Sequence, residues 1–363
     1  MVSHVQFPGL GLELTVDRVA FSIGGFQVYW YGILIALGMV LAMAFAFHYA
    51  VDFGIDADRL VDVVCIGTVM AILCARAYYI AFAPFEYETL WQMLDIRQGG
   101  IAIYGAVIGA FLFGGLAARW RKIPILPLFD LVAMGFLIGQ GVGRGGNFFN
   151  QEVFGVNTDL PWGMFSEATQ AYLLSVQGEL AARGVTVDPS RPVHPTFFYE
   201  FVWCIAGFFV LWALMKKRRF HGQIFLEYLV WYGAGRFWIE GIRSDTLMGA
   251  GTMPVSQQVA LVCVVGGLAL LAAGFYRAKG KALAVPLAVD SANLKRMKTA
   301  DGPTAVHPSE LPANASHAEF AAATRRMNDA LAGILAASPN GEEKPQAPRA
   351  PETPDEQEGT SGE

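Results

Sequence analysis

The sequence has little charge and almost no cysteine. Only 16% of its 363 residues are charged, whereas 54% are hydrophobic, and the mean hydropathy is +0.40. All four cysteines lie in apolar runs and none forms a Cys-x-x-Cys pair, so we expect neither a disulfide framework nor a metal site. The P-loop, nucleophile-elbow and His-Glu-x-x-His patterns are missing, and no cofactor is expected. The N-terminus lacks a basic segment before a short apolar core, which argues against a cleavable signal peptide.

Long apolar runs dominate what is present. Several are long enough to cross a bilayer, which takes about 20 helical residues. The fold class that we predict is an all-α integral membrane protein, a seven-transmembrane-helix bundle within residues 1–281. Residues 1–26 are expected to lie at the membrane interface. The predicted spans are 27–50, 60–83, 101–120, 126–148, 196–215, 222–242 and 254–276.

The distribution of basic residues predicts the orientation. Lysines and arginines gather at 119–122, 216–219 and 277–281, and such loops stay in the cytoplasm. The N-terminus is therefore predicted outside and the C-terminus inside. Asp62 and Asp130 are expected to be solvated at the inner ends of their spans.

Besides residues 1–26, two longer segments fall outside the seven spans. The insertion between helices 4 and 5, at about 153–193, lies on the outer side and has helix-like apolar spacing from 166 to 183. The tail, 282–363, is rich in Pro, Ala and Glu, a composition that cannot bury a core. We expect it to be a disordered cytoplasmic tail with one weak amphipathic helix around 317–337.

The most unusual stretch, residues 143–152, closes the fourth span with the sequence Gly-Arg-Gly-Gly-Asn-Phe-Phe-Asn-Gln-Glu. An arginine near mid-bilayer costs roughly 2.5–3.5 kcal/mol, so it is kept where it faces a cavity or a partner. Arg144, Asn147 and Gln151 would share one helix face. Gly143 and Gly146 would let another backbone approach closely.

Polar residues of other spans fall at the same depth, in the outer half of the bilayer. Guanidinium groups bind phosphate oxygens in a fork geometry that lysine cannot match. The sequence therefore indicates an integral-membrane enzyme or binder that acts on a phospholipid headgroup. The residues at this depth are Tyr31, Arg76, Tyr104, Arg144, Asn147, His194, Glu200, Arg236, Glu240 and Arg243.

Some of these residues have a second interpretation. Arg236, Glu240 and Arg243 are spaced as a structural ion-pair ladder along one helix. Arg76 could extend to the outer interface, and His194 before Pro195 could simply begin a helix. No function is assigned to Glu227.

Residues 143–152 resemble the signature of bacterial prolipoprotein diacylglyceryl transferases, G-R-x-G-N-F-x-N-x-E. The resemblance covers about residues 20–277. It extends to Trp30-Tyr31-Gly32, Gly99-Gly100 with Tyr104-Gly105, His194-Pro195-Thr196 with Tyr199-Glu200, and Tyr232-Gly233 with Arg236, Glu240 and Arg243.

The resemblance implies transfer of the diacylglyceryl group from phosphatidylglycerol to the lipobox cysteine in the signal peptide of a preprolipoprotein. A thioether would form and glycerol phosphate would leave. The implied location is the bacterial inner membrane, with membrane lipid but no nucleic acid as partner.

The family pattern also implies roles for individual residues. Arg144 and Arg236 would surround the phospholipid, with Tyr31, Asn147, Asn150, Glu152, Glu240 and Arg243 in the same site, while Glu200 would support the structure or orient the substrate. Some members carry histidine where this chain has Tyr104, so no histidine at that position can be the base here. We expect Tyr104 to donate a hydrogen bond and a carboxylate, Glu152 or Glu240, to relay the thiol proton.

A different class of protein could also use such residues. A small-solute transporter or channel with an arginine-lined outer vestibule is the alternative. Transporters often contain inverted repeats and helices broken near mid-membrane. No internal repeat is visible in this sequence, and its polar residues lie near one face.

Overall fold

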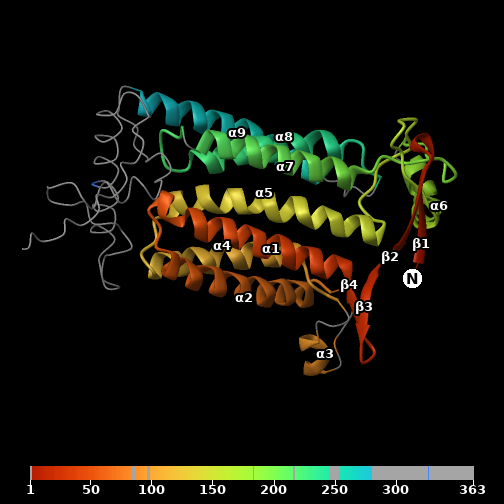
Figure 1. Ribbon diagram of the computed structural model, residues 1–363, viewed down its shortest axis with the longest axis horizontal. Coiled ribbons are helices and arrows are strands. Elements are labelled where there is room, and N and C mark those ends of the chain that lie inside the picture. The colour runs from red at the N-terminus through yellow and green to blue at the C-terminus, as the bar shows by residue number, and fades with distance from the viewer. Residues whose placement is uncertain are drawn as a thin grey trace, which may run out of the picture.

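A computed structural model describes residues 2–83, 87, 89–95, 99–182, 184–215, 217–244, 253–279 and 326. Seven long helices lie side by side in a bundle (Figure 1). The predicted tail, 282–363, lies outside the described residues except for residue 326. The bundle helices are α1 (Trp30–Tyr49), α2 (Ala57–Ala81), α4 (Ile103–Trp120), α5 (Ile125–Asn150), α7 (Thr196–Met215), α8 (Gln223–Glu240) and α9 (Val255–Ala278).

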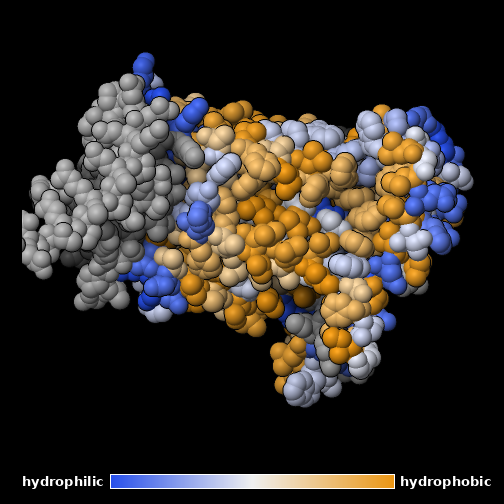
Figure 2. Space-filling view, viewed as in Figure 1, coloured by the Kyte–Doolittle hydropathy of each residue, from blue (hydrophilic) through white to orange (hydrophobic). Residues whose placement is uncertain are grey.

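Six of these helices are long and apolar enough to cross a membrane: α1, α2, α4, α5, α7 and α9. The mostly helical membrane architecture is thereby confirmed. The remaining helix, α8, has 18 residues and carries Glu227, Arg236 and Glu240. Figure 2 shows apolar side chains over most of the visible bundle surface, as expected for a surface that faces lipid rather than water.

A small domain covers one end of the bundle, which we call the capped end. Its sheet has the order β2–β1–β5, with antiparallel pairs from Val2↔Asp17 to Phe7↔Leu12 and from Val5↔Ser166 to Gln6↔Phe165. Helix α6 packs beside the sheet, over a core that includes Met164 and Leu173. The elements are β1 (Val2–Phe7), η1 (Pro8–Leu10), β2 (Leu12–Asp17), β5 (Phe165–Ser166) and α6 (Glu167–Ala182).

Two further elements project from the side of the bundle near this end (Figure 1). One is the hairpin of β3 (Val19–Ile23) and β4 (Phe26–Tyr29), whose turn residues Gly24 and Gly25 both have positive φ, as a tight two-residue hairpin turn requires. The other is the short helix α3 (Leu90–Leu94). The strands were not predicted within residues 1–26, although β2 alternates strictly between apolar and polar residues; each of these strands has only four to six residues. Helix α6 matches the helix expected at 166–183.

Helix α5 lies at the centre of the bundle. Its side chains Leu131, Met134 and Leu137 are fully buried and pack in one apolar core with residues of α2, α7 and α8. A central position fixes the helix on several sides. The polar residues at its capped end are therefore held among neighbouring helices rather than exposed at a free helix end.

At the other end of the bundle, the surroundings of Asp130 contradict the prediction that this residue is solvated. This aspartate on α5 is fully buried and accepts hydrogen bonds from the backbone N–H groups of Gly222 (2.7 Å) and Phe225 (2.9 Å). These donors belong to the first turn of α8, where backbone N–H groups lack helical partners. Asp62 is partly exposed and pairs with Arg121 at 2.7 Å. A buried side chain of α5 thus fixes the start of α8.

Two tryptophans lock α7 against α8. The Trp203 indole donates to the Trp231 carbonyl (2.9 Å), and the Trp231 indole donates to the Trp203 carbonyl (3.0 Å). The rings stack with centroids 4.7 Å apart. Each ring lies over a glycine of the other helix, and an added Cβ at Gly235 would lie 2.2 Å from the Trp203 indole nitrogen. This contact sets the register that places Glu200 of α7 beside Arg236 of α8.

We expect Gly235→Ala to lower the melting temperature by several degrees and to reduce turnover. The new methyl group collides with a ring held by two hydrogen bonds, and overpacking of this kind costs roughly 1–3 kcal/mol. Gly266→Ala on α9 is the matched control, because no atom lies within 4 Å of its added Cβ. Thermal unfolding in detergent measures the difference, and equal melting of the two variants would contradict this account of the α7–α8 contact.

Candidate active site

A buried carboxylate at the capped end brings three arginines together. Glu200 lies in the first turn of α7 and is 3% exposed. One of its oxygens contacts Nη2 of Arg144 on α5, and the other lies 2.5 Å from Nη1 of Arg236 on α8. The Arg243 guanidinium is 3.9 Å from the same oxygen. Segments far apart in the chain therefore meet at Glu200.

The ladder expected along α8 is also present. Nη2 of Arg236 lies 2.7 Å from a Glu240 oxygen, and Nη1 of Arg243 lies 3.7 Å from it. Arg236 thus contacts two carboxylates at once. The ladder does not replace the cluster around Glu200 but extends it, so Arg236 belongs to both.

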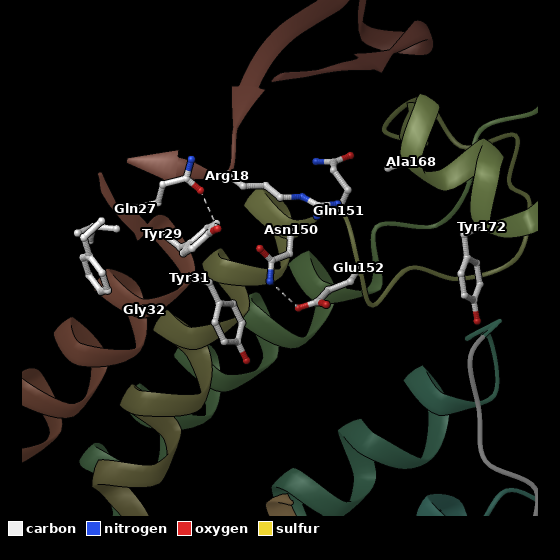
Figure 3. Close-up of a pocket in the computed structure, with 12 residues that line it drawn as sticks. Arg18, Gln27, Tyr29, Tyr31, Gly32, Asn150, Gln151, Glu152, Ala168 and Tyr172 are labelled. Carbon is white, nitrogen blue, oxygen red and sulfur yellow. Dashed lines mark hydrogen bonds between the residues drawn. The ribbon is translucent and has the colours of Figure 1, made fainter. Parts of the chain in front are cut away.

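On the other side of Arg144 the network continues through amides. Arg144 donates to the Asn147 side-chain oxygen (3.3 Å), and the Asn147 amide donates to Glu152 (2.8 Å). Asn150 also donates to Glu152, at 3.2 Å, and the two side chains face each other in Figure 3. Both asparagines thus orient one carboxylate.

Gln151 differs from its predicted position on the helix face. Helix α5 ends at Asn150, and Gln151 has a left-handed backbone with φ of 57°. Its amide donates back to the Phe148 carbonyl at 2.5 Å. The helix ends before Gln151, so the periodicity that relates Arg144 to Asn147 does not extend to it.

The arrangement leaves the guanidinium groups accessible. The side chains of Arg144 and Arg236 are each 21% exposed, whereas that of Glu200 is 4% exposed. An arginine has five N–H donors in a planar fork, and the carboxylates occupy only part of them. The buried acid holds the arginines in place while they remain able to bind an anion.

Two apolar grooves end at these arginines. The first groove, about 550 Å³, runs between α1, α4 and α5 and ends at Arg144 and Asn147. The second groove, about 610 Å³, runs between α4, α5, α8 and α9 and ends at Arg236, Glu240 and Arg243. Both are lined mainly by aliphatic and aromatic side chains. Apolar grooves that lead to clustered cations suit an amphiphile with an anionic head.

A third opening, the capped-end cleft, connects the site with the small domain. Its volume is about 810 Å³, and Figure 3 shows Glu152 between Tyr31 and Tyr172. Tyr31 lines both this cleft and the first groove. Its ring packs on Gly146, where an added Cβ would lie 2.5 Å from a ring carbon. Gly146 therefore makes room for the ring of Tyr31, a side chain, and not for the backbone of another helix as the sequence had suggested.

Besides Tyr31, which lines the first groove and the capped-end cleft, three predicted site residues lie outside the hydrogen-bonded network around Glu200. Tyr104 lines the second groove and is 58% exposed. Arg76 donates to the backbone carbonyls of residues 92, 93, 99 and 100 at 2.7–3.2 Å. His194 contacts the Tyr199 hydroxyl at 3.1 Å, and burial lowers the pKa of its imidazole, which favours the neutral form. Arg76 and His194 organise local structure near the site.

Replacing Tyr104 by phenylalanine should lower turnover by about 10- to 1,000-fold, the range for loss of one oriented donor. Tyr104→His should recover much of the rate, because imidazole can donate from the same place. The measurement compares both variants with wild type from about pH 6 to 9, a range that brackets the thiol pKa near 8.5. A fully active Tyr104→Phe at every pH would show that this tyrosine only lines the groove.

Among the polar residues of the grooves, Gln140 was not predicted. Gln140 lies on α5 and lines both grooves. The signal was available, because Gln140 stands four residues before Arg144 in an otherwise apolar segment. The Gln140 amide donates a hydrogen bond to the Tyr228 hydroxyl. Tyr228 is distant in sequence, so this pair is evident only from the fold.

The fold and the site define a multi-pass membrane protein whose clustered arginines lie where apolar grooves meet. Comparison with known proteins identifies the family: residues 18–273 match the model for prolipoprotein diacylglyceryl transferase. The chain belongs to this family, and it is a transferase.

Individual relatives agree with this assignment. The chain is 37% identical to the phosphatidylglycerol–prolipoprotein diacylglyceryl transferase of Geobacillus kaustophilus, over 70% of this chain and 91% of the relative. The Clostridioides difficile enzyme of the same name is 36% identical, over 70% and 93%. That of Clostridium novyi is 39% identical, over 70% and 95%. These similarities do not favour the alternative of a solute transporter.

Proposed function

We propose that this chain transfers the diacylglyceryl group of phosphatidylglycerol to a cysteine thiol in the lipobox of a prolipoprotein. The observation that carries the proposal is the position of Arg144 and Arg236, which contact one buried carboxylate at the point where two apolar grooves end. A diacyl lipid with an anionic phosphate matches both parts of this site.

The arginines supply the electrostatic part of the reaction. The thiol sulfur attacks the glycerol carbon that bears the phosphate, a carbon–sulfur bond forms, and the carbon–oxygen bond to phosphate breaks. The electron pair stays on the departing glycerol phosphate, where the guanidinium groups stabilise the developing charge. Nearby cations also favour the thiolate, whose unperturbed pKa is about 8.5.

The thiol proton needs an acceptor within the site. His194 is not suited to this role, because its ring contacts Tyr199 rather than the arginine network. The carboxylates of Glu152 and Glu240 face the capped-end cleft and the second groove respectively. We infer that one of them relays the proton, and that Asn147 and Asn150 orient Glu152 through their hydrogen bonds.

We further infer that α8 is the seventh span and that the capped end lies in the periplasm of a bacterial inner membrane. Arg119 and Arg277 lie at helix ends opposite to the arginine site, which supports a cytoplasmic location for those ends. A reporter fused after Lys281 should be cytoplasmic, and one inserted near Gly178 periplasmic. The reverse pattern would move the site away from secreted substrates.

The decisive test uses purified protein in detergent, phosphatidylglycerol and a lipobox peptide. Mass spectrometry should show a peptide with one added diacylglyceryl group, and glycerol phosphate should appear in equal amount. A peptide with Cys→Ser should stay unmodified. Absence of the modified peptide with folded protein would refute the proposed function.

A further inference from the structure

Gln140 lies directly below the arginine cluster. It precedes Arg144 by four residues on α5, so it lies on the same helix face and about 6 Å deeper along the axis. Among the residues that the structure describes, it is the only polar one that lines both the first and the second groove. Its neighbour Phe136 is the other residue shared by the two grooves. Lipid that reaches the arginines through either groove passes this position.

A hydrogen bond to α8 fixes the Gln140 amide. Its Nε2 lies 3.0 Å from the Tyr228 hydroxyl oxygen, to which it donates. Tyr228 is buried and stacks on Tyr232 with ring centroids 5.6 Å apart. The second N–H of the amide has no hydrogen-bond partner within the part of the chain that the structure describes, and the side chain is partly exposed to the grooves.

We propose that the Gln140 amide binds an ester carbonyl of the diacyl lipid and so sets the depth of the glycerol group. This inference rests on the proposed function. In a glycerophospholipid the phosphate is followed by the glycerol carbons, the two ester groups and the acyl chains, in that order. With the phosphate at Arg144 and Arg236, the ester groups lie about one helical turn deeper, at Gln140.

The chemistry of the two groups matches. An ester carbonyl only accepts hydrogen bonds, and the amide offers a free N–H. A polar group left unpaired in an apolar groove is unfavourable, so the lipid carbonyl satisfies a donor that the protein leaves open. The contact positions the carbon attacked by sulfur, and it selects an ester-linked lipid over an ether-linked one.

A purely structural role for Gln140 predicts a different result for stability and lipid preference. If the Gln140–Tyr228 pair only joins α5 to α8, then Gln140→Leu and Tyr228→Phe remove the same hydrogen bond. Both variants would lower stability alike, and neither would change the preference among lipids. A ratio of rates for two lipids, measured on one enzyme preparation, separates the two roles, because it does not depend on the amount of folded protein.

The experiment measures KM and kcat for diester phosphatidylglycerol and for its diether analogue of equal chain length, in mixed micelles with the lipobox peptide. Wild type should have a KM for the diether that is about 3- to 10-fold higher, the effect of one neutral hydrogen bond. Gln140→Leu should raise the KM for the diester to the diether value. Tyr228→Phe keeps the amide and should keep a preference for the diester.

The outcomes distinguish this inference from the proposed function. If wild type modifies no peptide with either lipid, the proposed function fails. If wild type is active but uses both lipids equally, or if Gln140→Leu keeps the wild-type preference, the function stands and the role of Gln140 is refuted.

Discussion

Replacing Arg144 or Arg236 by lysine is expected to lower kcat by about 100- to 1,000-fold while the melting temperature stays near that of wild type. Lysine keeps the positive charge beside Glu200, so the buried carboxylate stays paired. It cannot form the planar, two-pronged contact with phosphate that a guanidinium forms. Loss of one oriented group that stabilises transition-state charge has an effect of this size.

The control is Arg121→Lys, which makes the same change at the opposite end of the bundle, where Arg121 pairs with Asp62. It should keep wild-type turnover. If Arg236 were only part of the ladder with Glu240, Arg236→Lys would stay active and Glu240→Gln would destabilise the protein. Near-normal turnover in both lysine variants at the site would contradict the phosphate-binding role.

Glu200→Gln should have the second large effect, on stability and on turnover together. Glu200 is buried and contacts Arg144 and Arg236. Removing one partner of a fully buried ion pair costs about 3–5 kcal/mol, and the cost is smaller here because both guanidinium groups are 21% exposed and Arg236 keeps its contact with Glu240. We expect the melting temperature to fall by several degrees and turnover to fall at least as far as in the lysine variants.

Glu167→Gln on α6 is the matched control. It makes the same chemical change at an exposed residue away from the cluster. Thermal unfolding and peptide modification should both stay near wild type in this variant. A Glu200→Gln protein that melts normally and retains its activity would show that the carboxylate does not hold the arginines.

Much of the bundle could be predicted from the sequence, because long apolar runs bounded by basic loops determine helices in a membrane. The transmembrane spans predicted at 126–148 and 196–215 correspond closely to α5 and α7. The strands at residues 2–29 could not be predicted in this way, because β1 gains its partner β5 from residues 165–166. Pairing over that separation depends on the fold of the whole chain.

The site was predictable in its residue types and only partly in its contacts. Arg144 and Arg236 were expected because guanidinium groups are costly within a membrane span. The central place of Glu200 was not evident, since its three partners lie on other segments of the chain. Arg76 looked like a further phosphate ligand, yet it binds backbone carbonyls. Which acceptors an arginine finds depends on loops whose paths the sequence pattern does not reveal.

The most direct test of the central claim measures lipid binding by the arginines themselves. Wild type, Arg236→Lys and Arg121→Lys are heated with short-chain phosphatidylglycerol or with diacylglycerol of the same chains, which lacks the phosphate. A ligand that binds only the folded state raises the melting temperature. We predict stabilisation of wild type and Arg121→Lys by phosphatidylglycerol alone, and its loss in Arg236→Lys. Equal stabilisation by both lipids, or an undiminished effect in Arg236→Lys, would contradict the claim that the cluster binds phosphate.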